Sequence, residues 1–121
     1  MKLATSTGDF GGYVGPIAEK VRCFKNTKFK YINAELGGNA FMVDDDNEWR
    51  KVIDNIGEAA AEAGVTFVQA HSPGVNLFSS DPEKARIAVR AVRRSIEACH
   101  ILGIDPTVVH ASWHKQFTLK D

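Results

Sequence analysis

Three side chains that could do chemistry stand at or near the ends of short apolar runs. Glu35 lies in "KYINAEL", His71 ends "TFVQAH", and His110 follows the valines of "TVVHAS". A neutral imidazole can bind a metal ion, accept a proton or hydrogen-bond a hydroxyl group, and a carboxylate can act as a general base. Because the three residues recur at matching places, we predict that they form one site. A purely structural interpretation is also open. In it, each histidine hydrogen-bonds a loop carbonyl, and Glu35 is an exposed carboxylate that binds nothing.

A polar stretch begins at the end of the first apolar run. Thr5, Ser6 and Thr7 lead into Gly8 and Asp9, and further glycines continue the segment. These glycines match neither the G-x-G-x-x-G dinucleotide fingerprint nor the phosphate loop G-x-x-x-x-G-K-[ST]. We therefore expect a flexible loop here.

These residues must be positioned by alternating strands and helices. The apolar runs have the length of strands, and the segments between them have a helical period. Strands that alternate with helices favour a parallel sheet built from βα units. The expected strands span residues 2–6, 30–36, 66–71 and 107–112, and the expected helices span about residues 13–25, 44–63 and 80–102.

The second expected helix has a clear beginning and end. Asp44, Asp45 and Asp46 open it, where the helix dipole favours negative charge, and Gly64 follows it as a C-cap signal. We therefore interpret the aspartates as helix-end residues and not as a metal cluster. The predicted buried stripe consists of Trp49, Val52, Ile53, Ile56, Ala60 and Ala63.

The third expected helix opens with Ser80-Asp81-Pro82-Glu83, a capping-box pattern with proline in the first turn. Gly103 closes it. We expect its arginines to lie mostly off the buried stripe, on a solvated face. The arginines are Arg86, Arg90, Arg93 and Arg94, and the predicted stripe consists of Ala85, Ala88, Val89, Val92, Ile96, Cys99 and Leu102.

The expected sheet brings the three candidate residues together. The carboxyl ends of parallel strands lie at one edge, and that edge carries the functional loops of barrels and of open sheets. His71 is followed by Ser-Pro-Gly, which cannot prolong a central strand because proline lacks a backbone donor. We therefore expect Glu35, His71 and His110 to converge on a common rim.

Composition sets limits on the partners. The chain has 121 residues, of which 44% are hydrophobic, and its 15 basic residues balance 15 acidic ones. A zero net charge gives no argument for nucleic acid or an anionic membrane as partner, and no apolar run approaches a membrane span. Cys23 and Cys99 form neither a ligand cluster nor a disulfide framework. We expect a soluble cytoplasmic protein with one domain over residues 1–121.

One long segment resembles a known superfamily. The stretch "IGEAAAEAGVTFVQAHSPGVNLFSSDPEKARIAVRAVRRSIEACHILGIDPTVVH" is similar to the xylose-isomerase-like TIM barrels. The shared features are a helix ending in A-G, then H-x-P, a long helix with S-I-E, then L-G-I and V-V-H. This superfamily includes sugar-phosphate isomerases and epimerases, inosose-handling enzymes and endonuclease IV. The similarity runs over roughly residues 2–112 and implies half of a TIM barrel.

The resemblance implies an enzyme that uses a divalent metal, Mn, Mg, Co or Zn, on a sugar or sugar phosphate. The metal would polarise a carbonyl while a carboxylate moves a proton. In the isomerase branch, Glu35, His71 and His110 match positions that contact substrate. In the endonuclease IV branch, His71 and His110 would instead hold metal, and "HSPGVNL" resembles a stretch of that branch. The neutral charge argues against DNA as partner.

The resemblance covers only the N-terminal half of a barrel. A complete barrel needs eight βα units, and most metal ligands and proton-moving carboxylates of the family come from its second half. We therefore expect the chain alone to be inactive. It is either the N-terminal part of a longer sugar or sugar-phosphate isomerase or epimerase, or a half-barrel that forms a homo-oligomer or binds a complementary half-barrel, since open sheet edges favour association. The alternatives are a non-catalytic half-barrel that binds a partner, and an open flavodoxin-like sheet with helices on both faces.

Overall fold

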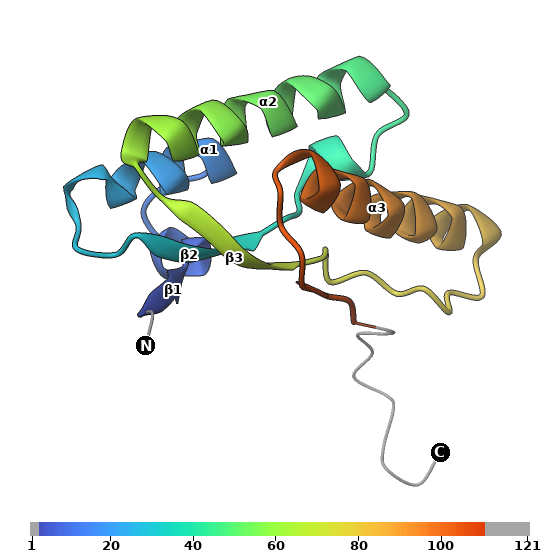
Figure 1. Ribbon diagram of the computed structural model, residues 1–121. Coiled ribbons are helices and arrows are strands. Elements are labelled where there is room, and N and C mark those ends of the chain that lie inside the picture. The colour runs from blue at the N-terminus through green and yellow to red at the C-terminus, as the bar shows by residue number, and fades with distance from the viewer. Residues whose placement is uncertain (1–2, 111–121) are drawn as a thin grey trace, which may run out of the picture.

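The strands form one parallel sheet. The structure is a computed structural model that describes residues 3–110. The four strands within these residues pair in the order β1-β2-β3-β4, and every pair is parallel (Figure 1). The predicted alternation of strands and helices is thereby confirmed. The strands are β1 (Ala4–Ser6), β2 (Tyr31–Glu35), β3 (Thr66–His71) and β4 (Thr107–Val108).

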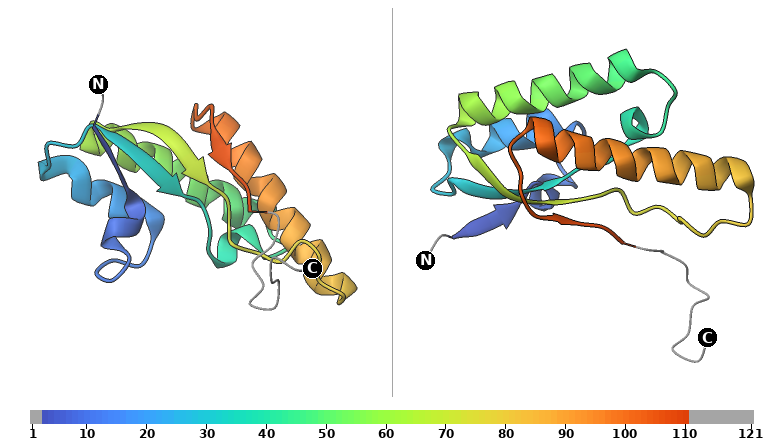
Figure 2. Two further views of the ribbon diagram at one scale, coloured as in Figure 1. Left: turned by 90° about the horizontal axis from the view of Figure 1, so that it is seen from below. Right: turned by 45° about the vertical axis from the view of Figure 1, so that its right-hand side comes forward.

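The helices of the described residues cover one face of this sheet. They are α1 (Ile17–Arg22), α2 (Asp46–Ala63) and α3 (Pro82–Ile101), accompanied by the short 3-10 segments η1 (Thr7–Phe10), η2 (Cys23–Asn26) and η3 (Asn39–Phe41). Figure 2 shows the opposite face of the strands without a helix in this part of the chain. An open flavodoxin-like sheet would carry helices on both faces, so the arrangement is that of half a TIM barrel.

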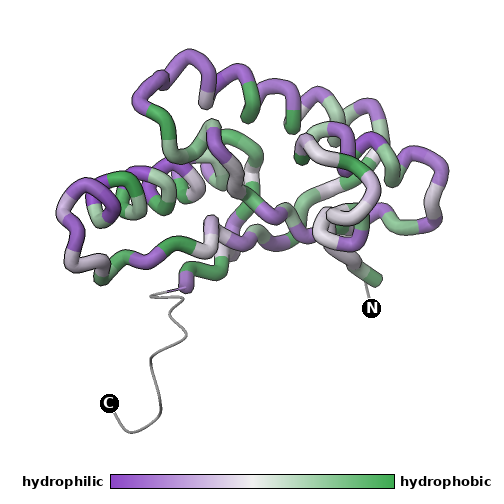
Figure 3. Tube along the Cα trace, turned by 180° about the vertical axis from the view of Figure 1, so that it is seen from behind, coloured by the Kyte–Doolittle hydropathy of each residue, from purple (hydrophilic) through white to green (hydrophobic). Residues whose placement is uncertain are grey.

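The core lies between the sheet and the helices. Alternate strand residues, Ile32 and Ala34 in β2 and Phe67 in β3, are buried toward the helices together with Ile53 and Ile56 of α2. Hydrophobic and hydrophilic residues alternate along α2 and α3 in Figure 3, as expected for helices with one buried side. Within residues 3–110, no helix combines the length and the apolar character that crossing a membrane requires.

Several predicted boundaries are corrected by the structure. The first helix begins at Ile17 and not near residue 13, because Pro16 holds an extended backbone at the helix start; its predicted last turn is the segment η2. The strand predicted over residues 107–112 ends at Val108, and the last two residues of that range lie outside the described part of the chain. By contrast, β3 spans the predicted residues 66–71.

The ends of α2 largely follow the prediction. Asp45 is the N-cap, and its carboxylate accepts hydrogen bonds from the backbone N–H groups of Asn47 and Glu48. Gly64 ends the helix in the left-handed conformation with φ of 63°, which glycine adopts without steric cost. The predicted stripe is buried except for Val52, which is partly buried, and Ala59 joins it.

The buried stripe of α3 differs from the predicted one. Val89 and Ile96 are 46% and 50% exposed, whereas Ala91, Ser95 and Ala98 are buried. The predicted stripe placed Val89 and Ile96 on the buried side and left out Ala91 and Ala98, so the buried side is rotated from the predicted one. Among the described residues, no element covers the outer side of α3, so its apolar residues stay exposed there. The N-cap is Asp81 and not Ser80.

Two of the α3 arginines are not on a solvated face, contrary to expectation. The Arg94 side chain is only 7% exposed, and its guanidinium donates to the carbonyl oxygens of Ala40 and Val43 and to the carboxylate of Asp46. Arg90 donates to the carbonyl oxygen of Met42. These contacts fasten the loop between β2 and α2 onto α3. The hydrogen bond from Arg94 holds the pKa of Asp46 below its ordinary value.

Candidate functional site

The candidate site lies at the carboxyl ends of β1, β2 and β3. Parallel pairing places Ser6 beside Asn33 and Glu35 beside His71. Because side chains alternate along a strand, Asn33 and Glu35 point away from the helices while Ala34 between them is buried against the core. The polar groups of this rim therefore meet on the face of the sheet that no helix of the described residues covers.

Glu35 is held by donors from two strands. Its Oε1 accepts a hydrogen bond of 3.0 Å from the hydroxyl of Ser6 and one of 2.8 Å from the side-chain amide of Asn33. The backbone N–H of Glu35 donates to the hydroxyl of Thr7, which is fully buried. The carboxylate remains 45% exposed, so it can still accept a hydrogen bond from a ligand.

His71 contacts the same network from β3. Its Nδ1 lies 3.2 Å from Oδ1 of Asn33 and 3.7 Å from Oε1 of Glu35. The side chain is 31% exposed. The ring is therefore anchored through one nitrogen by two neighbouring residues, while part of its surface faces solvent.

His110 lies just beyond β4 and extends the rim. Its ring stacks on that of His71, with centroids 5.8 Å apart and an angle of 21° between the ring planes. Sequence reasoning predicted that Glu35, His71 and His110 converge, and the structure brings all three together.

Two members of the network were not predicted as site residues. Ser6 was predicted only as a polar residue at the end of the first strand, and Asn33 was not singled out. Asn33 links Glu35, His71 and Ser6, the last through a contact of 3.2 Å to the Ser6 hydroxyl. A signal was present: Asn33 precedes Glu35 by two residues in a strand, and that spacing puts both side chains on one face.

The first residues after β1 form the 3-10 segment η1, where we expected a loop, and turns follow it over residues 11–13. Ser6 caps η1 by accepting a hydrogen bond from the backbone N–H of Gly8, and Asp9 completes a capping box. The Asp9 carboxylate also accepts a hydrogen bond from the Thr5 hydroxyl. Gly8 lies close to the site, since a Cβ atom there would stand 3.2 Å from Oγ of Ser6 and 3.6 Å from Cγ of Glu35.

The described residues do not complete a metal site. Within residues 3–110, no group of three or more His, Cys, Asp or Glu side chains gathers closely enough to hold a metal ion. The three aspartates at the start of α2, Asp44, Asp45 and Asp46, are occupied as a helix cap and as partners of the α3 arginines. A divalent metal at the rim would thus need ligands beyond these residues.

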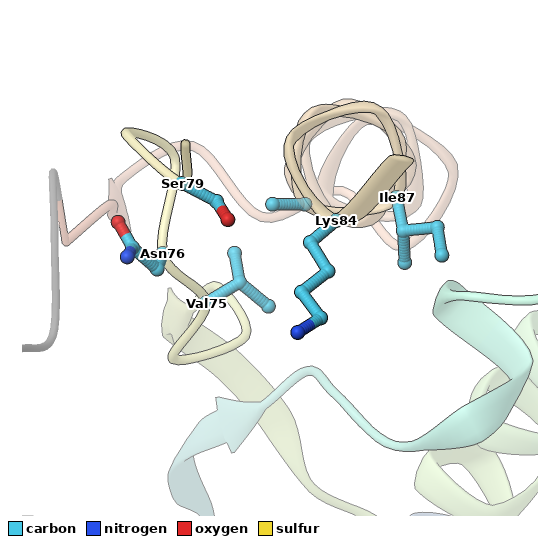
Figure 4. A pocket seen from close by; sticks show the side chains of 6 residues that line it. Val75, Asn76, Ser79, Lys84 and Ile87 are labelled. Carbon is cyan, nitrogen blue, oxygen red and sulfur yellow. The ribbon is translucent and has the colours of Figure 1, made fainter. Parts of the chain in front are cut away.

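A separate hollow lies beyond the rim, between the loop after β3 and the first turns of α3. Its volume is about 420 Å³. Figure 4 shows Lys84 and Ile87 of α3 on one side, with Val75, Asn76 and Ser79 of the loop on the other. None of the rim residues lines this hollow, so its polar groups do not act together with Glu35 and His71.

Comparison with known proteins places this fold. Residues 27–121 match the family model of the xylose isomerase-like TIM barrel. The structure is similar to the apo form of 3-keto-D-glucoside 4-epimerase, YcjR, from E. coli, with a TM-score of 0.65 and 21% identity, over 99% of this chain and 41% of that chain. SacUVDE is also similar, with a TM-score of 0.46 and 13% identity, over 95% of this chain and 50% of that chain. A comparison with curated proteins finds no match.

These findings differ in what they establish. The likeness to the epimerase concerns the fold, and the chain spans 41% of the epimerase's length. The family model, in contrast, covers most of the chain, and the parallel half-barrel agrees with it. The chain belongs to the xylose isomerase-like TIM barrel family.

Proposed function

We propose that this chain is the N-terminal part of a sugar or sugar-phosphate isomerase or epimerase. In this proposal Glu35, His71 and His110 bind hydroxyl groups of the substrate. The observation that carries the proposal is the convergence of these side chains on the open face of the sheet, at the carboxyl ends of the strands. The family membership and the likeness to a sugar epimerase support the substrate class.

The chemistry of the rim suits a polyhydroxylated ligand. Sugar hydroxyl groups donate and accept hydrogen bonds, and the rim offers an exposed carboxylate and imidazole nitrogens. Because Ser6 and Asn33 already hold Glu35, its carboxylate is fixed in position before substrate arrives. Such preorganisation lowers the entropy cost of orienting a bound substrate.

The remaining catalytic groups are assigned to chain beyond these residues. Isomerisation beside a carbonyl needs a base at the adjacent carbon and stabilisation of the charge that develops on the oxygen, which a divalent metal supplies in this family. The described residues form no complete metal site. The proposal therefore gives this chain the binding of hydroxyl groups, and it assigns the metal ligands and proton-moving carboxylates to a second half-barrel, in the same polypeptide or in a partner.

Binding of sugars to the chain tests the proposal directly. The isotope-labelled chain would be titrated with D-glucose and with D-glucose 6-phosphate while the imidazole resonances of His71 and His110 are followed by NMR. Both rings are expected to shift in a saturable way. Glu35→Gln is expected to weaken binding by roughly tenfold, the size of losing one charged hydrogen bond.

The control for this titration is His100→Gln. His100 is exposed in the last turn of α3. This end of the helix lies near the start of β4, whereas the rim lies at the opposite, carboxyl ends of the strands. This variant should bind as the unaltered chain does. If neither sugar moves the two rim histidines, or if Glu35→Gln binds both sugars unchanged, the assignment of the rim to substrate hydroxyls is wrong.

A further inference from the structure

The direction of each hydrogen bond at the rim can be worked out from Glu35. A carboxylate only accepts hydrogen bonds, and its Oε1 lies 3.0 Å from Oγ of Ser6 and 2.8 Å from the side-chain nitrogen of Asn33. Both neighbours must therefore donate. Ser6 is able to do so, because its oxygen accepts from the backbone N–H of Gly8 at 3.0 Å and its single proton remains for Glu35.

The same reasoning fixes the orientation of the Asn33 amide. Its NH₂ group faces Glu35 and lies 3.2 Å from the Ser6 oxygen, so its carbonyl oxygen is the atom that faces His71. That oxygen is 3.2 Å from Nδ1 of His71. An amide oxygen accepts hydrogen bonds and cannot donate them.

Both atoms near Nδ1 of His71 are therefore acceptors. They are Oδ1 of Asn33 at 3.2 Å and Oε1 of Glu35 at 3.7 Å. A bare Nδ1 would direct its lone pair at two oxygens, which is repulsive, whereas a protonated Nδ1 forms a hydrogen bond with the nearer one. In a neutral imidazole the partner of one nitrogen decides which nitrogen carries the proton.

We infer that Asn33 is a positioning residue that holds the proton of His71 on Nδ1 and leaves Nε2 bare. An unconstrained neutral histidine favours the opposite arrangement, with the proton on Nε2. A bare Nε2 can accept a hydrogen bond from a hydroxyl group, and it is also the form of nitrogen that binds a metal ion. That use of Nε2 rests on the proposed function, whereas the position of the proton does not.

Nitrogen-15 NMR of the unaltered chain tests the inference, because long-range proton–nitrogen spectra distinguish a protonated ring nitrogen from a bare one. The measurement is made without sugar and at a pH high enough to keep imidazoles neutral. His71 is expected to show a protonated Nδ1 and a bare Nε2. A protonated Nε2 on His71 in the unaltered chain would overturn the inference without the need for any variant.

Two substitutions separate the role of Asn33 from a general effect on the fold. Asn33→Leu has a similar shape but no acceptor, so the ratio of the two tautomers should move roughly fivefold toward protonated Nε2, as for one ordinary hydrogen bond. Glu35→Gln keeps the Asn33 oxygen facing Nδ1, because the amide oxygen of the new side chain can still accept from the Asn33 NH₂ group, and should keep the proton there. His100 provides the internal control and should not change in either variant.

The outcomes also separate this inference from the proposed function. If Asn33→Leu leaves the His71 tautomer unaltered, Asn33 does not position the proton and the inference is wrong. If the tautomer behaves as expected but no sugar binds, the inference stands and the proposed function fails.

Discussion

At the scale of single residues, the rim depends on short contacts between neighbouring strands. Ser6 belongs to β1, Asn33 and Glu35 to β2, and His71 to β3, and each contacts a residue of another strand. A side chain in such a network is fixed by partners that lie far away in the sequence. Small steric changes beside the network should therefore alter ligand binding more than they alter stability.

Gly8→Ala tests this expectation. The added methyl group would stand 3.2 Å from Oγ of Ser6 and 3.6 Å from Cγ of Glu35, so the Ser6 hydroxyl must move and its hydrogen bond to Glu35 should lengthen. We expect the amide and side-chain resonances of Ser6 and Glu35 to shift, and binding at the rim to weaken, with little change in the free energy of unfolding.

Gly12→Ala is the matched control for this change. A Cβ atom at Gly12 would meet nothing within 4 Å, and its φ is not positive. This substitution should stabilise the fold by about 0.4–1 kcal/mol through the unfolded state and leave the rim resonances in place. Equal responses to the two substitutions would show that Gly8 has no special relation to the site.

The sequence was informative about the outermost site residues and less so about the residue that links them. Glu35, His71 and His110 were found because strands end there and parallel strands end at one edge. Asn33 lies inside a strand, and the role of an amide there can be recognised only once its partners on the two neighbouring strands are known. Its role follows from tertiary contacts that no local pattern encodes.

At the scale of elements, the arginines of α3 connect that helix to the loop before α2. Arg94 is buried and donates to three carbonyl oxygens of this loop and to Asp46. Arg94→Met would fill similar space but leave these acceptors without a partner. We expect a loss of about 2–3 kcal/mol in the free energy of unfolding, measured by denaturant titration.

Arg93→Met is the control for this loss. Arg93 is the exposed neighbour of Arg94 on the same helix, and its substitution should change stability by less than about 0.5 kcal/mol. A similar loss in both variants would mean that helix propensity or net charge, and not the buried contacts of Arg94, explains the effect.

The ion pair adds a dependence on pH to this comparison. Arg94 lowers the pKa of Asp46 below its ordinary value of 3.8, so the folded state favours the ionised carboxylate. The resulting stabilisation is present above the unfolded pKa and is lost as the pH falls through the folded one. The difference in the free energy of unfolding between Arg94→Met and the unaltered chain should consequently shrink below about pH 4. The share of that difference that comes from the hydrogen bonds of Arg94 to carbonyl oxygens should persist.

Elements with strong local signals were predicted well, and the faces of α3 were not. Apolar periodicity and the following Ser-Pro-Gly located β3, and Gly64 located the end of α2. The face of α3 could not be chosen in the same way, because its apolar residues lie on more than one side. Burial of Arg94 depends on the loop it contacts, and exposure of Val89 and Ile96 depends on the absence of a neighbour within residues 3–110.

At the scale of the whole molecule, the chain has surfaces that a full barrel would cover. It spans 41% of the epimerase that it resembles. Both edge strands, β1 and β4, have one unpaired side within the described residues, and open edges favour association. The outer side of α3 exposes Val89 and Ile96, an apolar surface that no element of residues 3–110 covers.

Association through the outer side of α3 is the expected consequence. The chain should form dimers or larger species in sedimentation experiments as its concentration rises, since burial of apolar surface drives association. The double substitution Val89→Glu and Ile96→Lys places charges on this side and should shift the chain toward monomer. Tyr13→Ser is the control, because Tyr13 is 87% exposed but lies in the loop before α1. A strict monomer at every concentration would contradict the expectation, and association that survives the double substitution would assign it to the sheet edges instead.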